Sequence, residues 1–266
     1  LESLIRNSKG KFFSCLFLKK DGTIRAMNCR LGVKKGIKGT GKPIDNQSNS
    51  YVTVYDMVNK GYRVINLDTL AVIEMQGSGK LSGIASLNSD TTSNPFCKAM
   101  SKQEDTICSS CYSMSMLKTF RKNCVPKFKQ VGDYLSKKVH PMEYLPRCNA
   151  PVGRFHSHGE LINYKHCANL FNIAYNQPKV TFALWTKRKG LVSRAIRELG
   201  KPSNLILIYS NKKLDNVMQS VPKHFDKVFN NVTRDGENVN CHSSCIDCMM
   251  CYTVGDKTQQ IVEVVK

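Results

Sequence analysis

The chain has 266 residues, a length greater than one core of ordinary size needs. Its apolar fraction of 41% argues against an intrinsically disordered chain. Lys and Arg number 40 against 20 Asp and Glu, giving a formal net charge of +20 at pH 7 and a pI near 9.5. This charge indicates a polyanionic partner, nucleic acid first of all, although a basic surface that is merely solvated would have the same composition.

No run in the sequence approaches the roughly 20 apolar residues that cross a bilayer. The first residues, LESLIRNSKGK, lack the apolar segment of a secretory signal. We therefore expect a soluble cytoplasmic protein with no membrane partner. In that reducing compartment, the 12 unevenly placed cysteines favour metal ligands plus a few core thiols over a disulfide framework.

Residues 1–78 are rich in β-branched and aromatic residues. KFFSCLFL and TIRAMNCRL flank the Asp-Gly turn in KKDG, and YVTVYD and GYRVINLDTLAVIEM follow. Short strands so close together predict a small antiparallel β-barrel.

A basic, glycine-rich stretch, RLGVKKGIKGTGKP, lies between these strands. Glycine lets the backbone approach a phosphate closely, and lysine supplies the charge. The stretch is a predicted nucleic-acid contact through Arg30, Lys34, Lys35 and Lys38. A mobile, solvated loop explains the composition equally well.

The pattern SKGKFFSCLFLKKDGTIRAMNCRLGVKKGIKGTGK, followed by YVTVYDMVNKGYRVINLDTLAVIEM, resembles the Sm-like small β-barrel domain of many phage and prophage proteins. The resemblance covers about residues 3–76 and includes Arg25, Asn28, Arg30, Gly32, Val33 and Lys35. It implies a barrel and a phage or prophage source, and hence the cytoplasm of a host cell.

The second part of the chain reads differently. Residues 79–94 are rich in Ser, Gly, Asn and Thr and predict a linker. Beyond residue 95 we expect strands in VGRFHSHGE, KVTFALWT, SNLILIYS and FDKVFNNV, and helices in LINYKHCANLFNIAYN, GLVSRAIREL and KLDNVMQSV. This alternation predicts an α/β domain over residues 95–266, an incomplete parallel (β/α) barrel with its sites at the carboxyl ends of the strands; with the antiparallel barrel, the chain is α+β overall.

Two groups of cysteines bracket this domain. The first comprises Cys97, Cys108 and Cys111, the last two in CSSCY ahead of a helix-like run. Thiolates near a helix N-terminus suit a cation, and three of them would hold three irons of a four-iron cluster and leave one iron open.

The second group stands in CHSSCIDCMMC, and its two-residue spacings are typical of a [4Fe-4S] cluster. Its members are Cys241, Cys245, Cys248 and Cys251. A single zinc site that joins Cys108 and Cys111 with Cys245 and Cys248 is the alternative. The sequence places Cys15, Cys29 and Cys167 in the core and leaves Cys124 and Cys148 unassigned.

The order CSSCY, RFHSHGEL, TFALWTKR and a terminal cysteine cluster resembles the phage gene product 88 family over about residues 95–252. That family in turn resembles a compact radical S-adenosylmethionine enzyme. The resemblance implies a [4Fe-4S] cluster on the first cysteine group and S-adenosylmethionine as a cofactor. It places the amino group of the cofactor at Gly159 and Glu160, and Tyr112 of CSSCY is also predicted to bind the cofactor.

Polar residues follow the strand that VGRFHSHGE predicts. His156 and His158 alternate with other residues, point to one side, and are predicted, with Glu160, as general bases, ligands or substrate contacts. The alternatives are ordinary histidines and a Glu160 that caps a helix starting at Leu161.

A second strand end, TKRKG, carries Lys187, Arg188 and Lys189, which could hold a phosphate or carboxylate or lie in a solvated loop.

Two functions are compatible with these sequence features. One is an iron-sulfur, radical-type enzyme that acts on nucleic acid or a nucleotide. The other is a nucleic-acid-binding protein without a reaction, whose cysteines form a structural zinc or iron-sulfur site.

Overall fold

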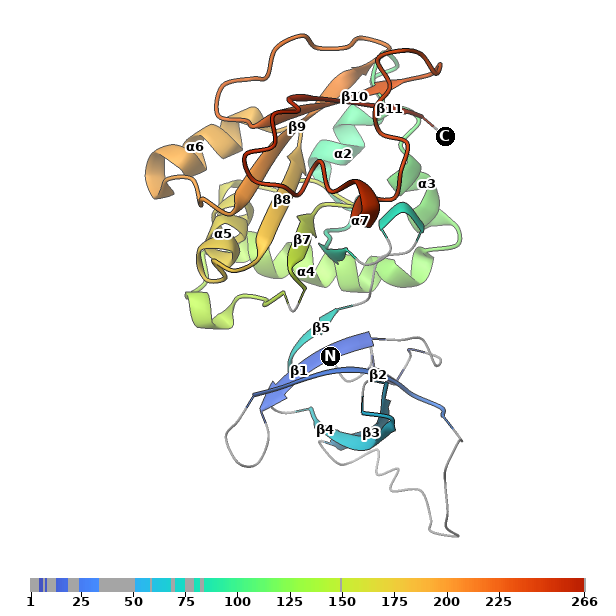
Figure 1. The fold of residues 1–266 in the computed structure, drawn as a ribbon, viewed down its shortest axis with the longest axis vertical. Coiled ribbons are helices and arrows are strands. Elements are labelled where there is room, and N and C mark those ends of the chain that lie inside the picture. Colours follow the sequence, from blue (N-terminus) through green and yellow to red (C-terminus); the bar gives the residue numbers. More distant parts are fainter. Residues whose placement is uncertain are drawn as a thin grey trace. The chain divides into compact units, whose positions relative to one another are not determined.

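The structure is a computed structural model that describes residues 5–6, 8, 13–18, 24–33, 51–57, 59–67, 70–74, 79–81, 84–148 and 150–265. The chain divides into two compact units, Leu1–Gln76 and Gly77–Lys266. Figure 1 shows the elements of each unit.

The first unit contains a five-stranded antiparallel sheet in the order β4-β3-β2-β1-β5. Its strands are β1 (Phe13–Leu18), β2 (Ile24–Arg30), β3 (Tyr51–Asp56), β4 (Gly61–Asn66) and β5 (Leu70–Glu74). Leu18 pairs with Ile24, so β1 and β2 form the hairpin that the Asp-Gly turn predicts. Within the described ranges no pairing joins the edge strands β4 and β5.

Side chains alternate along these strands between core and solvent. In β3, Val52 and Val54 are buried while Tyr51 and Thr53 are exposed. The buried thiols Cys15 and Cys29 lie 3.8 Å apart in the same core, as small apolar residues should. The interleaving of apolar and polar positions thus builds this core as the sequence predicts.

Arg30 ends β2 and is half-buried. Lys34, Lys35 and Lys38, the other predicted nucleic-acid contacts of this unit, lie outside the described residues.

The second unit is built on a six-stranded parallel sheet whose strands follow one another in chain order. They are β6 (Ala85–Leu87), β7 (Val152–Phe155), β8 (Thr181–Thr186), β9 (Leu205–Leu214), β10 (Lys227–Val232) and β11 (Gln260–Val264). Helical elements are η1 (Gly79–Leu81), α2 (Pro95–Met100), α3 (Tyr112–Lys118), η2 (Lys122–Cys124), α4 (Val125–Lys137), η3 (Met142–Tyr144), α5 (Tyr164–Tyr175), α6 (Lys189–Leu199) and α7 (Cys245–Cys248).

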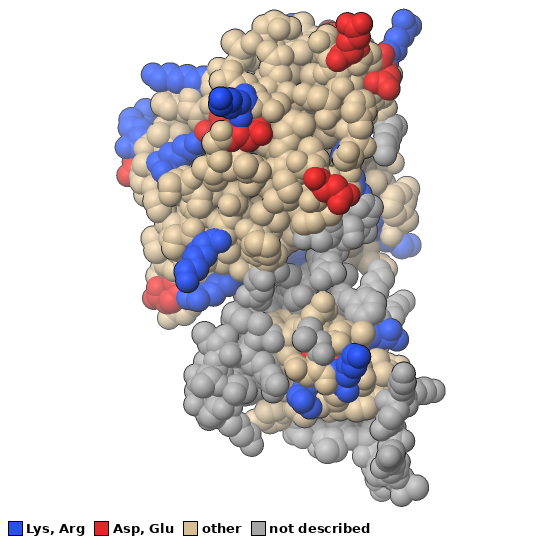
Figure 2. All heavy atoms as spheres, viewed as in Figure 1, with Lys and Arg blue, Asp and Glu red and all other residues tan. Residues whose placement is uncertain are grey.

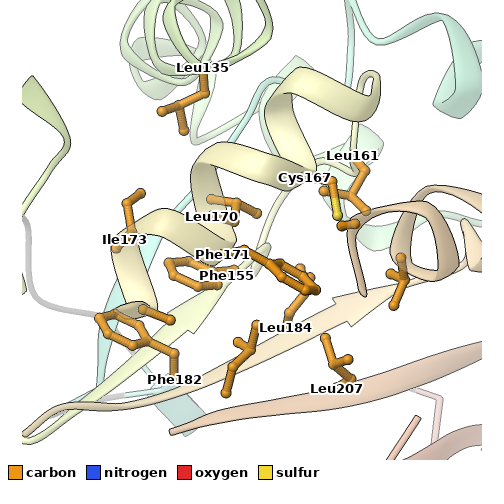
Figure 3. Packing of buried hydrophobic residues seen from close by; sticks show 14 of the residues in the cluster. Leu135, Phe155, Leu161, Cys167, Leu170, Phe171, Ile173, Phe182, Leu184 and Leu207 are labelled. Atoms are coloured by element: carbon orange, nitrogen blue, oxygen red, sulfur yellow. The ribbon is translucent and has the colours of Figure 1, made fainter. Parts of the chain in front are cut away.

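One face of this sheet, the helix face, packs against α4, α5 and α6. Phe155, Phe182, Leu184 and Leu207 point from the strands toward Phe171 of α5 (Figure 3). These side chains are almost fully buried, and burial of this kind supplies roughly 1.5–3 kcal/mol for each large one.

The opposite face, the cysteine face, packs against the segment that follows β10. Val152, Ala183, Trp185 and Ile206 cluster there with Tyr252. The residues of β8 are divided between the two faces of the sheet, because neighbouring side chains of a strand point to opposite faces. Figure 1 shows this segment, with α7, crossing the sheet.

Two predictions about this unit are wrong. Residues 79–94 are not a free linker, since they supply β6, which pairs with β7, and then the buried residues Ser89, Asp90 and Asn94. KLDNVMQSV is not a helix, because β9 continues to Leu214 and the chain turns at Asp215, whose φ is 54°. Asn211 and Asn230 then bind the backbone of that segment in place of helical hydrogen bonds.

The other predicted strands and helices of this unit are present within a few residues of the expected positions. Among the residues with coordinates described above, no helix is both long and apolar enough to cross a membrane. On the face drawn in Figure 2, most Lys and Arg side chains of this unit lie on the side of α5 and α6.

Candidate active site and cysteine regions

Residues 156–160, the HSHGE loop, follow β7 at the carboxyl end of the sheet. Gly159 has a φ of +86°, and a Cβ atom there would lie 2.2 Å from Oγ and 2.3 Å from the backbone oxygen of Ser89. Only glycine fits such a close approach at a left-handed position. Gly159 therefore has a structural reason to be glycine, and its prediction as a cofactor contact is not tested by this geometry.

Glu160 is buried, and its carboxylate accepts three hydrogen bonds. Oε1 accepts from the Leu161 N–H and the Thr186 hydroxyl, and Oε2 accepts from the Lys187 N–H at 2.8 Å. The carboxylate thus ties the end of β7 to the end of β8. It does not cap a helix starting at Leu161, because α5 starts at Tyr164 and Asn163 caps it.

His158 is held at both ring nitrogens. Arg121 donates to Nε2 at 3.0 Å, and since arginine has only donors, the neutral ring carries its hydrogen on Nδ1. Nδ1 then donates to the Ser113 hydroxyl at 2.8 Å, which in turn donates to the Thr91 hydroxyl. Thr91 also accepts from the Gly159 N–H. His158 therefore links α3, the HSHGE loop and residues 88–94.

Burial, followed by the charges of Arg121 and Arg154, lowers the pKa of His158 to about 4. The ring also stacks on Phe128 at 5.4 Å. A neutral, fully bonded imidazole is a positioning residue here rather than an exposed base. Phe128 of α4 is half-buried against this ring, whereas Phe120, which precedes α4, is 73% exposed.

His156 differs from His158. It is 5% exposed, has a φ of 66°, and packs edge-to-face on His166 at 5.2 Å. Neither of its ring nitrogens has a hydrogen-bond partner of normal geometry among the described residues. Burial lowers its pKa, so the ring is neutral. Of the predicted catalytic histidines, this is the one with nitrogens available to a ligand.

Cys97, Cys108 and Cys111, the three-cysteine region, are brought to the same carboxyl end. Cys97 lies in α2, which Asn94 caps, and the Asn94 side-chain amide also donates to the Glu160 carbonyl oxygen. The Ile107 N–H donates to the Lys212 carbonyl oxygen at 2.9 Å, which holds the turn before Cys108 against β9. Cys111 is the N-cap residue of α3, as the sequence predicts.

The charges of this region interact. Burial raises the pKa of Cys97, and the charges of Glu160, Cys111 and Cys108 raise it further. Burial lowers the pKa of Lys187, but the charges of Cys108, Glu160 and the other two thiols outweigh it and raise this pKa.

Tyr112 follows Cys111, and its hydroxyl donates to the Ser157 carbonyl oxygen. Its predicted contact with a cofactor is not tested, but this bond fixes the start of α3 to the HSHGE loop.

Residues 241–252, the terminal cysteine segment, lie on the cysteine face. Cys245 and Cys251 pack there beside Tyr252. Arg154 points to the same face, with its guanidinium carbon 3.9 Å from the centre of the Trp185 ring. Burial raises the pKa of Cys251 to about 12, and the charge of Arg154 opposes this shift.

Lys80 fixes the first thiol of the segment. Its Nζ lies 3.1 Å from Sγ of Cys241, 2.9 Å from the carbonyl oxygen of the same residue, and 2.6 Å from Glu263. Cys248 is the one exposed thiol of the four.

Within the described part of the chain, no three His, Cys, Asp or Glu side chains are positioned as a formed metal site. The seven predicted cysteine ligands thus gather in two regions, but their sulfur atoms would have to move closer to share a metal. Iron-sulfur and zinc both stay predictions.

Lys187, Arg188 and Lys189 line a cavity of about 520 Å³ at the ends of β8 and β9. The predicted basic strand end is therefore not a fully solvated loop. The sequence did not predict the neighbours of these three residues in the cavity, Phe96, Tyr209 and Lys212, because they come from distant elements. It also missed Asn94, although an Asn before Pro95 is a common start of a helix.

Two family models match the chain. The model of the WYL_2 family, described as an Sm-like SH3 beta-barrel fold, matches residues 1–71, and the model of gene product 88 matches residues 67–260. The chain belongs to the gene product 88 family. Both resemblances stated from the sequence are thereby confirmed. No curated protein and no solved structure matches the chain.

The gene product 88 match covers the three-cysteine region, the HSHGE loop, the basic strand end and the terminal cysteine segment. All four features therefore belong to the part of the chain that defines the family.

Proposed function

We propose that this member of the gene product 88 family is an iron-sulfur enzyme of the radical S-adenosylmethionine type that modifies a nucleic acid or a nucleotide. The observation that carries the proposal is that three thiols, the buried Glu160 carboxylate and the half-buried Lys187 lie in one region at the carboxyl end of a parallel sheet. Ligands bind at that end in open α/β sheets.

The residues present fit such a group by their donor chemistry. Cys97, Cys108 and Cys111 would hold it, and sulfur is the ligand that iron-sulfur clusters take. Ten residues separate Cys97 from Cys108, more than in the usual motif of these enzymes, and the Ile107 N–H anchors the end of this stretch to β9.

A four-iron cluster with one open iron supplies the electron for reductive cleavage of S-adenosylmethionine when both are bound. The residues of the chain would orient the bound groups and shield them from solvent. Glu160 has one acceptor position left on Oε2, since a carboxylate offers about four and three are used, and an ammonium group suits that position. The HSHGE loop is fixed by His158 and Tyr112, so the carboxylate stays in place.

The terminal cysteine segment would hold a second metal centre, iron-sulfur or zinc, on the cysteine face. In this proposal the first unit closes into a small barrel, and the second is an incomplete (β/α) barrel. The in-order parallel strands with helices on one face support the latter. The protein would act in the cytoplasm of a phage host.

The proposal is tested with protein purified without oxygen. We expect iron and sulfide in the protein and reductant-dependent cleavage of S-adenosylmethionine to 5'-deoxyadenosine and methionine. A variant with Cys97, Cys108 and Cys111 changed to Ser loses this cleavage, whereas the control with Cys124→Ser and Cys148→Ser keeps it. A colourless protein that contains only zinc would overturn the proposal.

A second function is favoured by the Sm-like match and the charge of +20, which do not require a reaction. The protein would then bind nucleic acid, with the cysteines closing a structural site. Affinity that falls steeply with salt, together with zinc and no cleavage, would favour this function. If neither DNA nor RNA binds at low salt, both functions lose their common partner.

A further inference from the structure

The cavity at the ends of β8 and β9 has a distinct charge pattern. Eight residues line it, and four of them are cations: Lys187, Arg188, Lys189 and Lys212. No Asp or Glu is among the eight. Its volume of about 520 Å³ lies within the range of ordinary small-molecule sites, roughly 300–1,000 Å³.

The cations of the cavity are held by contacts other than ion pairs. Among the residues described, none of the four forms an ion pair. The Arg188 guanidinium donates to the carbonyl oxygens of Leu161 and Ile162, and the Lys187 ammonium donates to the Ser210 hydroxyl at 2.9 Å. These partners are uncharged. The charge of Lys187 also interacts with that of Glu160, so it is chiefly the charges of Arg188, Lys189 and Lys212 that are available to an anion.

Two aromatic rings hold the cations in place. The Lys189 ammonium lies 4.2 Å from the centre of the Tyr209 ring, and Arg188 and Lys212 lie 5.1 and 5.7 Å from the centre of the Phe96 ring. Since cations cover these rings, the rings offer little surface for a base to stack on. The cavity therefore suits the anionic part of a ligand.

The start of α6 adds to the same field. Lys189 is the first residue of this 11-residue helix, no acidic residue lies in its first turn, and no side chain caps it. Its first backbone N–H groups are without helical partners and favour an anion.

We infer that this cavity binds the phosphate group of a nucleotide unit and is the substrate-anchoring subsite of the proposed enzyme. Only the role of the cavity as a substrate-anchoring subsite rests on the proposed function; the binding of phosphate does not. Lys187 connects the two regions, because its side chain lines the cavity and its N–H donates to the Glu160 carboxylate at 2.8 Å. A phosphate held there places the rest of the nucleotide beside the three-cysteine region.

The sharpest test changes Gly190, which lines the cavity and whose added Cβ would meet no atom within 4 Å. Gly190→Asp puts a carboxylate among the cations, and an acid in the first turn favours the helix, so the fold is kept. Gly190→Asn has the same shape without the charge. In calorimetric titrations with inorganic phosphate and a nucleoside 5'-monophosphate, we expect Gly190→Asp to weaken binding at least 30-fold and Gly190→Asn less than threefold.

A second pair of variants removes charge. Lys189→Gln with Lys212→Gln should weaken binding at least tenfold, whereas Lys179→Gln with Lys223→Gln removes two exposed charges outside the cavity and should change it less than twofold. A dinucleoside phosphate without a terminal phosphate shows whether a backbone diester binds as well as a terminal monoester.

Equal weakening by both pairs, or wild-type protein that binds none of the three probes at low salt, would overturn the inference. Iron content is measured on the same samples. Because Gly190→Asp should leave iron unchanged, failure of the phosphate site and failure of the iron-sulfur proposal give different results.

Discussion

The three-cysteine region and the terminal cysteine segment carry the same side chain but are held by different forces. A polar network fixes the first: Asn94 binds the Glu160 carbonyl, Glu160 binds two strand ends, and His158 binds Ser113 and Arg121. Apolar packing holds most of the second, since Tyr252 and two of its thiols lie on Trp185 and its neighbours, and Cys241 is held by a charged side chain, that of Lys80.

This difference indicates different tasks. Hydrogen-bond networks fix direction as well as distance, which a reacting group requires, whereas burial without direction is sufficient for a structural or auxiliary metal site. The cationic cavity also adjoins only the first region through Lys187. The proposed chemistry therefore belongs at the three-cysteine region, and four predictions test the contrast.

The largest effect is expected from Gly159→Ala in the polar network. The new Cβ would lie 2.2 Å from Ser89 Oγ at a φ of +86°, so the HSHGE loop must shift. We expect this shift to lower the free energy of unfolding by about 4 kcal/mol. Urea unfolding followed by fluorescence measures this, because the single tryptophan, Trp185, reports on the second unit.

Gly236→Ala is the matched control, since an added Cβ there meets no atom within 4 Å, and it should stay within about 0.5 kcal/mol of wild type. A Gly159→Ala protein that unfolds at the wild-type urea concentration would show that the loop is not tightly held.

The next effect tests the packed region. Tyr252 is 2% exposed, and its ring centre lies 5.7 Å from that of Trp185. Tyr252→Ala leaves a cavity on the cysteine face and should lower the free energy of unfolding by about 3 kcal/mol. Tyr252→Phe keeps the ring and should cost less than about 1 kcal/mol. Equal losses in the two variants would mean that the hydroxyl, and not packing, holds the segment.

The sequence predicts most of this second unit because its signals are local. The period of Phe182, Leu184 and their neighbours marks a strand, and Gly200 and Pro202 end α6. β6 and β11 were missed because they are short edge strands that only pairing with β7 and β10 stabilises. KLDNVMQSV has a helical pattern, but continued pairing of β9 with β10 overrides it.

The site was partly predictable for the same reason. The cysteines, Glu160 and the basic strand end are visible as motifs, and the structure brings the first cysteine group, Glu160 and Lys187 together. The partners of His158 and the aromatic walls of the cavity come from segments far apart in sequence. Nothing local in the sequence marks such contacts.

A smaller loss is expected from Glu160→Gln. The amide replaces one accepting oxygen with a donor, which then faces either the Lys187 N–H or the Thr186 hydroxyl, so the free energy of unfolding should fall by about 2 kcal/mol. Glu198→Gln is the control: this carboxylate is exposed and bonds Arg194, so its loss should stay below about 0.5 kcal/mol. If the two variants lose the same amount, the Glu160 bonds do not hold the strand ends together.

The smallest effect is a pH dependence that belongs to the polar network alone. His158 has a pKa near 4 when folded and about 6.5 when unfolded, so the unfolded chain binds more protons between these values. The contribution of His158 to the free energy of unfolding is fully present above pH 6.5 and is lost as the pH falls toward 4, by about 1 to 2 kcal/mol at pH 5.

The variant His158→Gln tests this pH dependence. It is less stable than wild type at pH 7.5, because it breaks the bonds to Ser113 and Arg121, but it lacks the loss of stability at low pH. The gap in the free energy of unfolding between the two proteins should therefore narrow at pH 5, whereas the Gly236→Ala control, which changes no titratable group, runs parallel to wild type at both pH values. A stability gap that is the same at both pH values would mean that His158 is charged in the folded protein. The polar network would then not be the rigid support of Glu160 by which the first cysteine region differs from the second.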